Sequence, residues 1–156
     1  MDAIAHFVFG LWLYQKLPSP TTIILSVILD IDHLLGFLYD KITRRMSIHL
    51  PSLLHLAYRP RSWLHSIAGI LVISLPLIPF YGFSPVFIPL LTHLLIDMLD
   101  RAGVMLLFPF SRKYIHGILP ASYLPEDEAL TRRHKASHVP SIILIIISAI
   151  MIFLKV

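Results

Sequence analysis

Residues 85–108, PVFIPLLTHLLIDMLDRAGVMLLF, form a long apolar stretch with His93 and Asp97 inside it. These two residues are four positions apart, so on a helix their side chains share one face, one turn apart. Similar apolar stretches lie at residues 3–17, 21–39, 62–80 and 139–154. All but the first approach or exceed the roughly 17 residues that span the hydrocarbon core of a bilayer. The sequence therefore predicts an all-α fold, a polytopic membrane helical bundle with about five transmembrane helices.

The composition favours the same class of protein. Of the 156 residues, 56% are hydrophobic and 14% are charged, whereas soluble domains carry about 25% charged residues. The mean hydropathy of +0.78 points the same way. We expect one membrane-embedded domain over residues 1–156. The chain has no cysteine, so any bound metal must use nitrogen and oxygen ligands.

The net charge of +4 does not indicate nucleic-acid binding, because the basic residues gather in two connecting segments. Residues 40–61 and 109–138 each hold five Lys or Arg side chains. With five spans both segments lie on the same side, and the positive-inside rule places them and the N-terminus in the cytoplasm. The predicted location is the cell (inner) membrane, multi-pass, with membrane lipids as partners.

Asp and His residues lie inside or at the edges of the apolar stretches, where each ionisable group is costly, about 2.5–3.5 kcal/mol at a helix centre on insertion scales. Asp and His are the residue types that hold zinc or a similar divalent ion. On the predicted topology they lie at similar depth, toward the cytoplasmic side, and could share a site for one to three zinc ions or another divalent metal. For each residue the alternative is an interhelical hydrogen bond worth about 1 kcal/mol. The predicted ligands are His6, Asp30, Asp32, His33, His65, His93 and Asp97.

Carboxylates and imidazoles around a divalent ion suit hydrolysis, because the ion lowers the pKa of bound water and polarises a phosphoryl or carbonyl oxygen. We assign Asp30 or Asp32 as ligand or general base. Arg59 is a candidate to hold an anionic oxygen of the substrate. The predicted function is therefore that of an integral membrane metal-dependent hydrolase.

Two other functions fit the same residues. A non-enzymatic metal-binding or metal-transport protein would use the ligands to line a pathway, and its ligands should continue across the membrane. A structural scaffold would use the polar residues only to join helices.

The chain also resembles the YdjM-like family of LexA-regulated, inner-membrane metal-dependent hydrolases. Four blocks carry the resemblance in the right order: Ala5-His-Phe7, Leu29-Asp-Ile-Asp-His33, Arg59 to Ser66, and Thr92-His-Leu-Leu-Ile-Asp97 continuing to Gly103-Val and Phe108-Pro-Phe-Ser111. The sequence departs from the family pattern with Leu29 for proline, Tyr58 for His, Leu64 for Thr and Asp100-Arg101 for Thr-Pro.

The family is distantly similar to zinc-dependent phospholipase C. This resemblance implies phosphoesterase chemistry on a phospholipid or lipid-linked phosphoester near the cytoplasmic face. It also implies that His65, His93, Asp97 and the cluster from Asp30 to His33 are zinc ligands.

Overall fold

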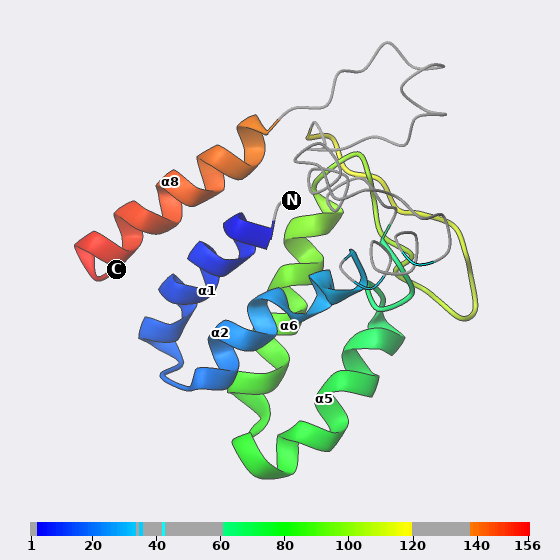
Figure 1. The fold of residues 1–156 in the computed structure, drawn as a ribbon, viewed down its shortest axis with the longest axis horizontal. Helices are drawn as coiled ribbons and strands as arrows, with labels where there is room; N and C mark the ends of the chain where they lie inside the picture. Colours follow the sequence, from blue (N-terminus) through cyan, green and yellow to red (C-terminus); the bar gives the residue numbers. More distant parts are fainter. Residues whose placement is uncertain (1–2, 34, 36–41, 43–60, 120–137) are drawn as a thin grey trace.

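The computed structural model describes residues 3–33, 35, 42, 61–119 and 138–156 (Figure 1). The helices in these ranges are α1 (Ala3–Lys16), α2 (Pro20–Val27), the short 3-10 helix η1 (Ile28–Asp30), α5 (Ile67–Tyr81), α6 (Phe83–Met98) and α8 (Val139–Leu154). After α6, two isolated bridges pair Asp100 with Leu119 and Val104 with Ile115. The described part of the chain is thus mostly helical.

The prediction of a polytopic membrane bundle is wrong. Within the described ranges, no helix combines the length and the apolar character needed to cross a membrane. The longest, α6 and α8, have 16 residues each. At a rise of 1.5 Å per residue such a helix extends about 24 Å, less than the roughly 30 Å of a hydrocarbon core. The predicted multi-pass location in the inner membrane, with a cytoplasmic N-terminus, is contradicted by the same finding.

The apolar stretches are longer than the helices they contain. In the stretch 21–39, α2 ends at Val27 and the chain continues as the 3-10 helix to Asp30. In the stretch 85–108, α6 ends at Met98. In the stretch 62–80, α5 begins only at Ile67, where the Ser66 hydroxyl accepts a hydrogen bond from the Gly69 amide and caps the helix. Hydrophobicity alone therefore overestimated the helix lengths.

The helices pack in a chain of neighbours. Helix α8 lies against α1, α1 against α2, α2 against α6, and α6 against α5 (Figure 1). Gly82, with a φ of 83°, forms the sharp turn between α5 and α6, a backbone conformation that favours glycine. The buried core lies between α2, η1, α5, α6 and the segment after α6, and consists of Leu25, Leu29, Ile70, Val86, Leu90, Leu94 and Val104.

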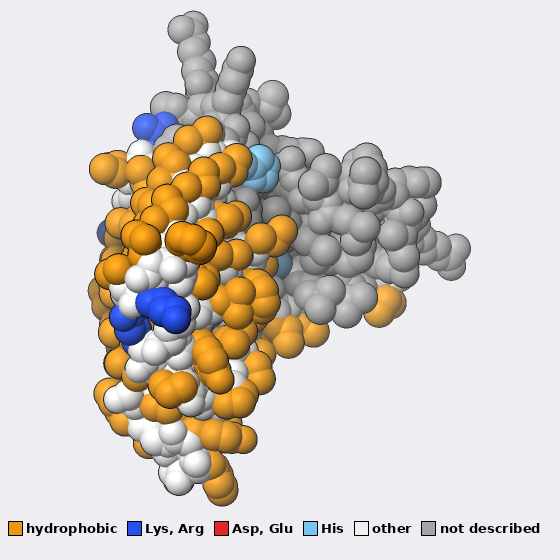
Figure 2. Space-filling model, turned by 90° about the vertical axis from the view of Figure 1, so that its left-hand side faces the viewer, with side chains coloured by type: hydrophobic (Ala, Val, Ile, Leu, Met, Phe, Trp, Pro, Cys, Tyr) orange, Lys and Arg blue, Asp and Glu red, His pale blue; other side chains and the backbone are white. Residues whose placement is uncertain are grey.

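Much of the outer surface is apolar. On α8 the buried residues are Pro140, Ser141 and Ser148, while large apolar side chains such as Ile146 and Phe153 are exposed. Figure 2 shows a face on which hydrophobic side chains cover most of the described surface. Helix α8 therefore turns its serines inward and its isoleucines outward, the reverse of a helix that faces water.

Gly10 permits close packing of α1 on α2. A Cβ atom at this position would lie 2.7 Å from the Cβ and 2.8 Å from the Oγ of Ser26. Alanine in a helix is normally about 1 kcal/mol more stable than glycine, whereas overpacking costs about 1–3 kcal/mol. We expect Gly10→Ala to lower the free energy of unfolding by about 1 kcal/mol, measured by urea denaturation.

The control is the double variant Gly10→Ala, Ser26→Gly, which removes the side chain that the new methyl group meets. Its loss of stability should be smaller than the sum of the two single losses. A Gly10→Ala protein more stable than wild type would show that α1 and α2 are not in this close contact.

Candidate metal centre

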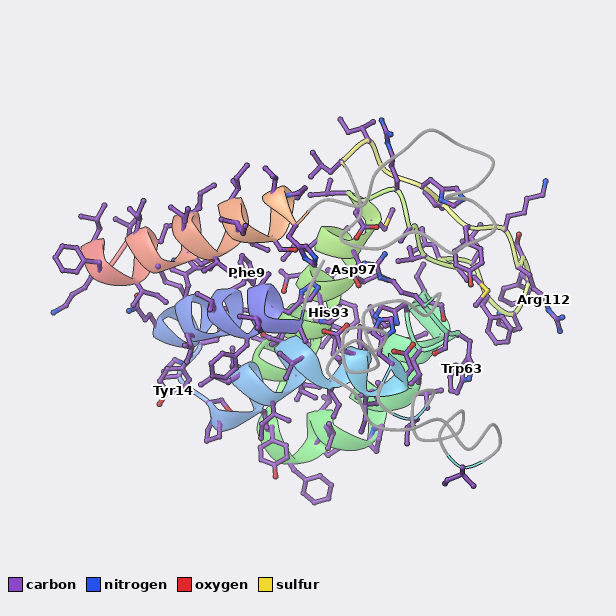
Figure 3. The ribbon with its side chains drawn as sticks, turned by 45° about the horizontal axis from the view of Figure 1, so that its top comes forward. Phe9, Tyr14, Trp63, His93, Asp97 and Arg112 are labelled. Carbon is purple, nitrogen blue, oxygen red and sulfur yellow. The ribbon has the colours of Figure 1, made fainter. Side chains whose placement is uncertain are left out.

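The fold brings the predicted ligands together from four parts of the chain. His6 lies in α1, Asp30 at the end of η1, and His65 just before α5, while His93 and Asp97 lie in α6. Asp32 and His33 follow η1 directly in helical conformation. His6, His65, His93 and Asp97 are almost completely buried. Figure 3 shows His93 and Asp97 on α6 near the start of α1.

Two sets of side chains could each hold a metal ion. The first set is His6, Asp30, His93 and Asp97, and the second is Asp30, His33 and His65. Within each set the candidate ligand atoms all lie within 4.8 Å of one another. Asp30 belongs to both sets, so the two form one continuous centre. A buried His and Asp cluster suited to a metal ion is thus present.

The spacing of the central atoms fits ligands of a shared ion better than hydrogen bonds. The Nε2 atoms of His65 and His93 each lie 3.4 Å from Asp97 Oδ2. They lie 3.8 and 3.6 Å from Asp30 Oδ1. Hydrogen bonds between nitrogen and oxygen are about 2.7–3.2 Å long. Two ligands bound to zinc at about 2.0–2.1 Å with tetrahedral geometry are about 3.3–3.4 Å apart.

Several buried atoms in the centre have no hydrogen-bond partner among the described residues. They are Asp30 Oδ2, Asp32 Oδ1, His33 Nδ1, His65 Nε2 and His93 Nε2. Buried polar atoms are nearly always hydrogen-bonded, and a group of exceptions at one place points to an ion that satisfies them. The donor set of nitrogen and oxygen atoms is of the kind that divalent metals bind, so these residues fit a metal ion.

The outer nitrogen atoms of two histidines are held by the protein. His93 Nδ1 lies 2.6 Å from the Ser26 carbonyl oxygen, which can only accept, so Nδ1 donates and Nε2 faces the centre. His65 Nδ1 lies 3.1 Å from Asp32 Oδ2, which also accepts a hydrogen bond from the Ser62 amide. Carbonyl and carboxylate partners of this kind orient histidine ligands in metal sites. Asp32 therefore orients His65 and is not part of either ligand set.

His6 has a different environment. Its ring stacks on that of His93, with centroids 3.7 Å apart and planes within 9°. Its Nε2 lies 3.0 Å from Asp97 Oδ1, a hydrogen-bond distance. Burial, with the neighbouring His93, lowers the pKa of His6 to about 4. His6 thus makes the interhelical hydrogen bond that the sequence left open as the alternative, while lying within reach of the first set.

The centre has an excess of negative charge. Burial raises the pKa of Asp30, but His93 and His65 outweigh it and hold that pKa well below its usual value. Burial also lowers the pKa of His65 and His93, but the surrounding carboxylates outweigh it and raise these pKa values to about 10 and about 9. The carboxylates thus favour the protonated, positively charged form of His65 and His93. A bound cation would supply the same compensating charge.

Two charged residues of the centre were missed in the sequence. Arg61 and Asp100 are buried beside Asp97, and Arg61 contacts both carboxylates at 2.7–2.9 Å. Arg61 is one of the basic residues of the first connecting segment, and the predicted substrate-binding residue Arg59 lies outside the described residues. Their positions in the sequence could have indicated both residues, because Arg61 lies four residues before the predicted ligand His65 and Asp100 lies three residues after the predicted ligand Asp97.

Comparisons with known proteins do not assign a family. No family model matches the chain, and searches of curated proteins and of solved structures gave no significant match. The resemblance to the YdjM-like family stays a prediction from its motifs, and the function has to be inferred from the site.

The first test is metal content. We expect purified protein to retain a stoichiometric divalent ion after dialysis, measured by elemental mass spectrometry. His93→Gln should lose at least one ion per chain, because it removes a buried nitrogen whose position the Ser26 carbonyl fixes. His116→Gln is the matched control, because His116 is exposed and contacts the Arg101 carbonyl outside the centre. Equal metal content in all three proteins would exclude the assignment.

Proposed function

We propose that this protein is a metal-dependent hydrolase that cleaves phosphoesters at the centre formed by His6, Asp30, His33, His65, His93 and Asp97. The observation that carries the proposal is the spacing of the His65 and His93 Nε2 atoms, 3.4 Å from the same oxygen of Asp97 and without hydrogen-bond partners among the described residues. Nothing in a purely structural network requires buried nitrogens to stop short of hydrogen-bond distance.

Zinc is the ion that these ligands favour. Histidine nitrogen together with a few carboxylate oxygens suits zinc and related transition metals. Magnesium and calcium prefer sites built from oxygen alone. Because Asp30 belongs to both ligand sets, each of its oxygen atoms could serve one ion, and we propose two zinc ions per chain.

A bound zinc ion lowers the pKa of its water and polarises the phosphoryl oxygen. The protein supplies the other parts. Asp32 accepts hydrogen bonds at Oδ2 from the Ser62 amide and at 3.1 Å from His65, which fixes the carboxylate. Its other oxygen, Oδ1, has no hydrogen-bond partner among the described residues. This free oxygen supports Asp32 as the general base that would accept the proton of an attacking water.

The substrate that we propose is a phosphoester carried by a lipid. The support comes from the surface, where α8 exposes Ile146 and Phe153 and the segment after α6 exposes Phe110 and Ile118. Exposed apolar side chains of this kind are found at binding surfaces, and acyl chains are ligands of matching chemistry. The resemblance to the YdjM-like family implies the same substrate class.

The catalytic role of Asp32 can be separated from metal binding. We expect Asp32→Asn to lower the kcat for bis(p-nitrophenyl) phosphate by about 10²–10⁴-fold. The zinc content should stay close to wild type, because the amide oxygen of asparagine can still accept the hydrogen bonds from Ser62 and His65. Asp97→Asn should instead bind zinc measurably more weakly and lose activity together with it. Full activity in Asp32→Asn, or no zinc-dependent hydrolysis in wild type, would reject the proposed reaction.

The substrate class can be tested on one headgroup. With phosphodiester substrates whose acyl chains lengthen, we expect kcat/KM to rise, because each added methylene that is buried contributes about 0.8 kcal/mol. Assays are run below the critical micelle concentration of each substrate so that aggregation does not contribute. If kcat/KM is independent of chain length, the protein is a phosphoesterase of soluble substrates.

A further inference from the structure

The Arg61 side chain is buried and its hydrogen-bonding capacity is used up by the protein. Its Nε lies 2.8 Å from Asp97 Oδ2. Its Nη2 donates to Asp97 Oδ1 at 2.8 Å and to Asp100 Oδ2 at 2.7 Å. Its Nη1 donates to Asp100 Oδ1 at 2.9 Å and to the Gly103 carbonyl at 3.1 Å. A guanidinium has five N–H donors; four of them donate these hydrogen bonds, and the fifth, at Nε, lies in the ion pair with Asp97.

This saturation excludes one obvious role. An arginine that clamps a substrate phosphate must offer free donors at an accessible surface. Arg61 has a relative exposure of 5%, and its donors already meet two carboxylates and a carbonyl oxygen. Its partners are therefore groups of the protein.

Those partners place Arg61 between two parts of the metal centre. Asp97 lies at the end of α6, and Asp100 lies in the turn that follows, where its Oδ1 also accepts the amides of Ala102 and Gly103. Arg61 begins the short segment that leads to His65, and its carbonyl oxygen accepts a hydrogen bond from the Tyr114 hydroxyl. The guanidinium thus joins the segment of His65 to the end of α6.

We propose that Arg61 is a positioning residue for metal binding, which holds the Asp97 carboxylate in the orientation that points Oδ2 at the His65 and His93 nitrogens. Asp100 in turn holds Arg61 along the neighbouring edge of the guanidinium, at Nη1 and Nη2. This inference rests on the proposed function, because it takes Asp97 as a metal ligand.

The geometry requires arginine rather than a positive charge alone. The planar guanidinium meets Asp97 at both carboxylate oxygens and Asp100 at both as well. A lysine ammonium is a point charge with three donors on a flexible stem, so it cannot hold two carboxylates in one plane. Arg61→Lys therefore keeps the charge and removes the orientation.

The test measures zinc affinity by competition with a chromophoric chelator. We expect Arg61→Lys to bind zinc about 10–100-fold more weakly than wild type, the usual effect of losing a group that orients a metal ligand. Asp100→Asn should weaken zinc binding in the same direction by a smaller factor, because Arg61 keeps Asp97 but loses its second anchor. Arg112→Lys, an exposed arginine far from the centre (Figure 3), is the matched control and should bind zinc as wild type does.

The double variant Arg61→Lys, Asp97→Asn separates positioning from a general structural role. If Arg61 acts through Asp97, the double variant should bind zinc no more weakly than Asp97→Asn alone. The absorption spectrum of the cobalt-substituted protein should also change in Arg61→Lys and stay unchanged in Arg112→Lys. Additive losses in the double variant would overturn the proposal, as would a zinc affinity of Arg61→Lys within about threefold of wild type, a margin well below the 10–100-fold loss expected.

The outcomes also distinguish this inference from the proposed function. If wild type binds no zinc, both fall. If wild type binds zinc and hydrolyses phosphoesters while Arg61→Lys and Asp100→Asn match it, only the role of Arg61 falls. If Arg61→Lys does not fold, as judged by circular dichroism, Asp100→Asn decides, and unchanged zinc affinity in that variant overturns the inference.

Discussion

The rest of the site depends on the burial of the Asp97 carboxylate at the centre of the molecule. An uncompensated buried charge costs several kcal/mol, so its partners must be supplied by other parts of the chain. Arg61 meets Asp97 from the segment before α5, His6 from α1, and His93 from the preceding turn of α6. The need to satisfy one carboxylate thus holds together elements that are far apart in the sequence.

The local part of the site could be predicted from the sequence, and the long-range part could not. His93 and Asp97 share a helical face because they are four residues apart, and the distance from His93 Nε2 to Asp97 Oδ2 is 3.4 Å. The pairing of Arg61 with Asp97 spans 36 residues and follows from how the segment before α5 packs on α6, which no helical period encodes. Burial of Arg61 was hidden for the same reason, because a basic residue in a connecting segment is usually exposed.

The sequence predicted helices at the right places, but the predicted polytopic membrane bundle was wrong. Apolar stretches at the right places gave the helices α1, α5, α6 and α8, but the helix ends depend on local features that hydrophobicity does not report. Helix α5, capped by Ser66, begins at Ile67, five residues after the predicted start at residue 62. The 3-10 helix η1 replaces regular helix over Ile28–Asp30 and ends at the candidate ligand Asp30. Because of these helix ends, the described helices are shorter than the apolar stretches and too short to cross a membrane.

A metal ion bound at this centre would couple binding to folding. The histidines and aspartates come from α1, η1, the residues after η1, the segment before α5, and α6, and the core that they adjoin is small. Among the described residues, Arg61 and protons on the imidazoles of His65 and His93 compensate the surrounding carboxylates. An ion that binds the folded chain and not the unfolded chain stabilises the folded state by mass action. The buried excess of negative charge, which is a cost to the chain without a cation, is therefore the feature that would favour cation binding by the folded chain.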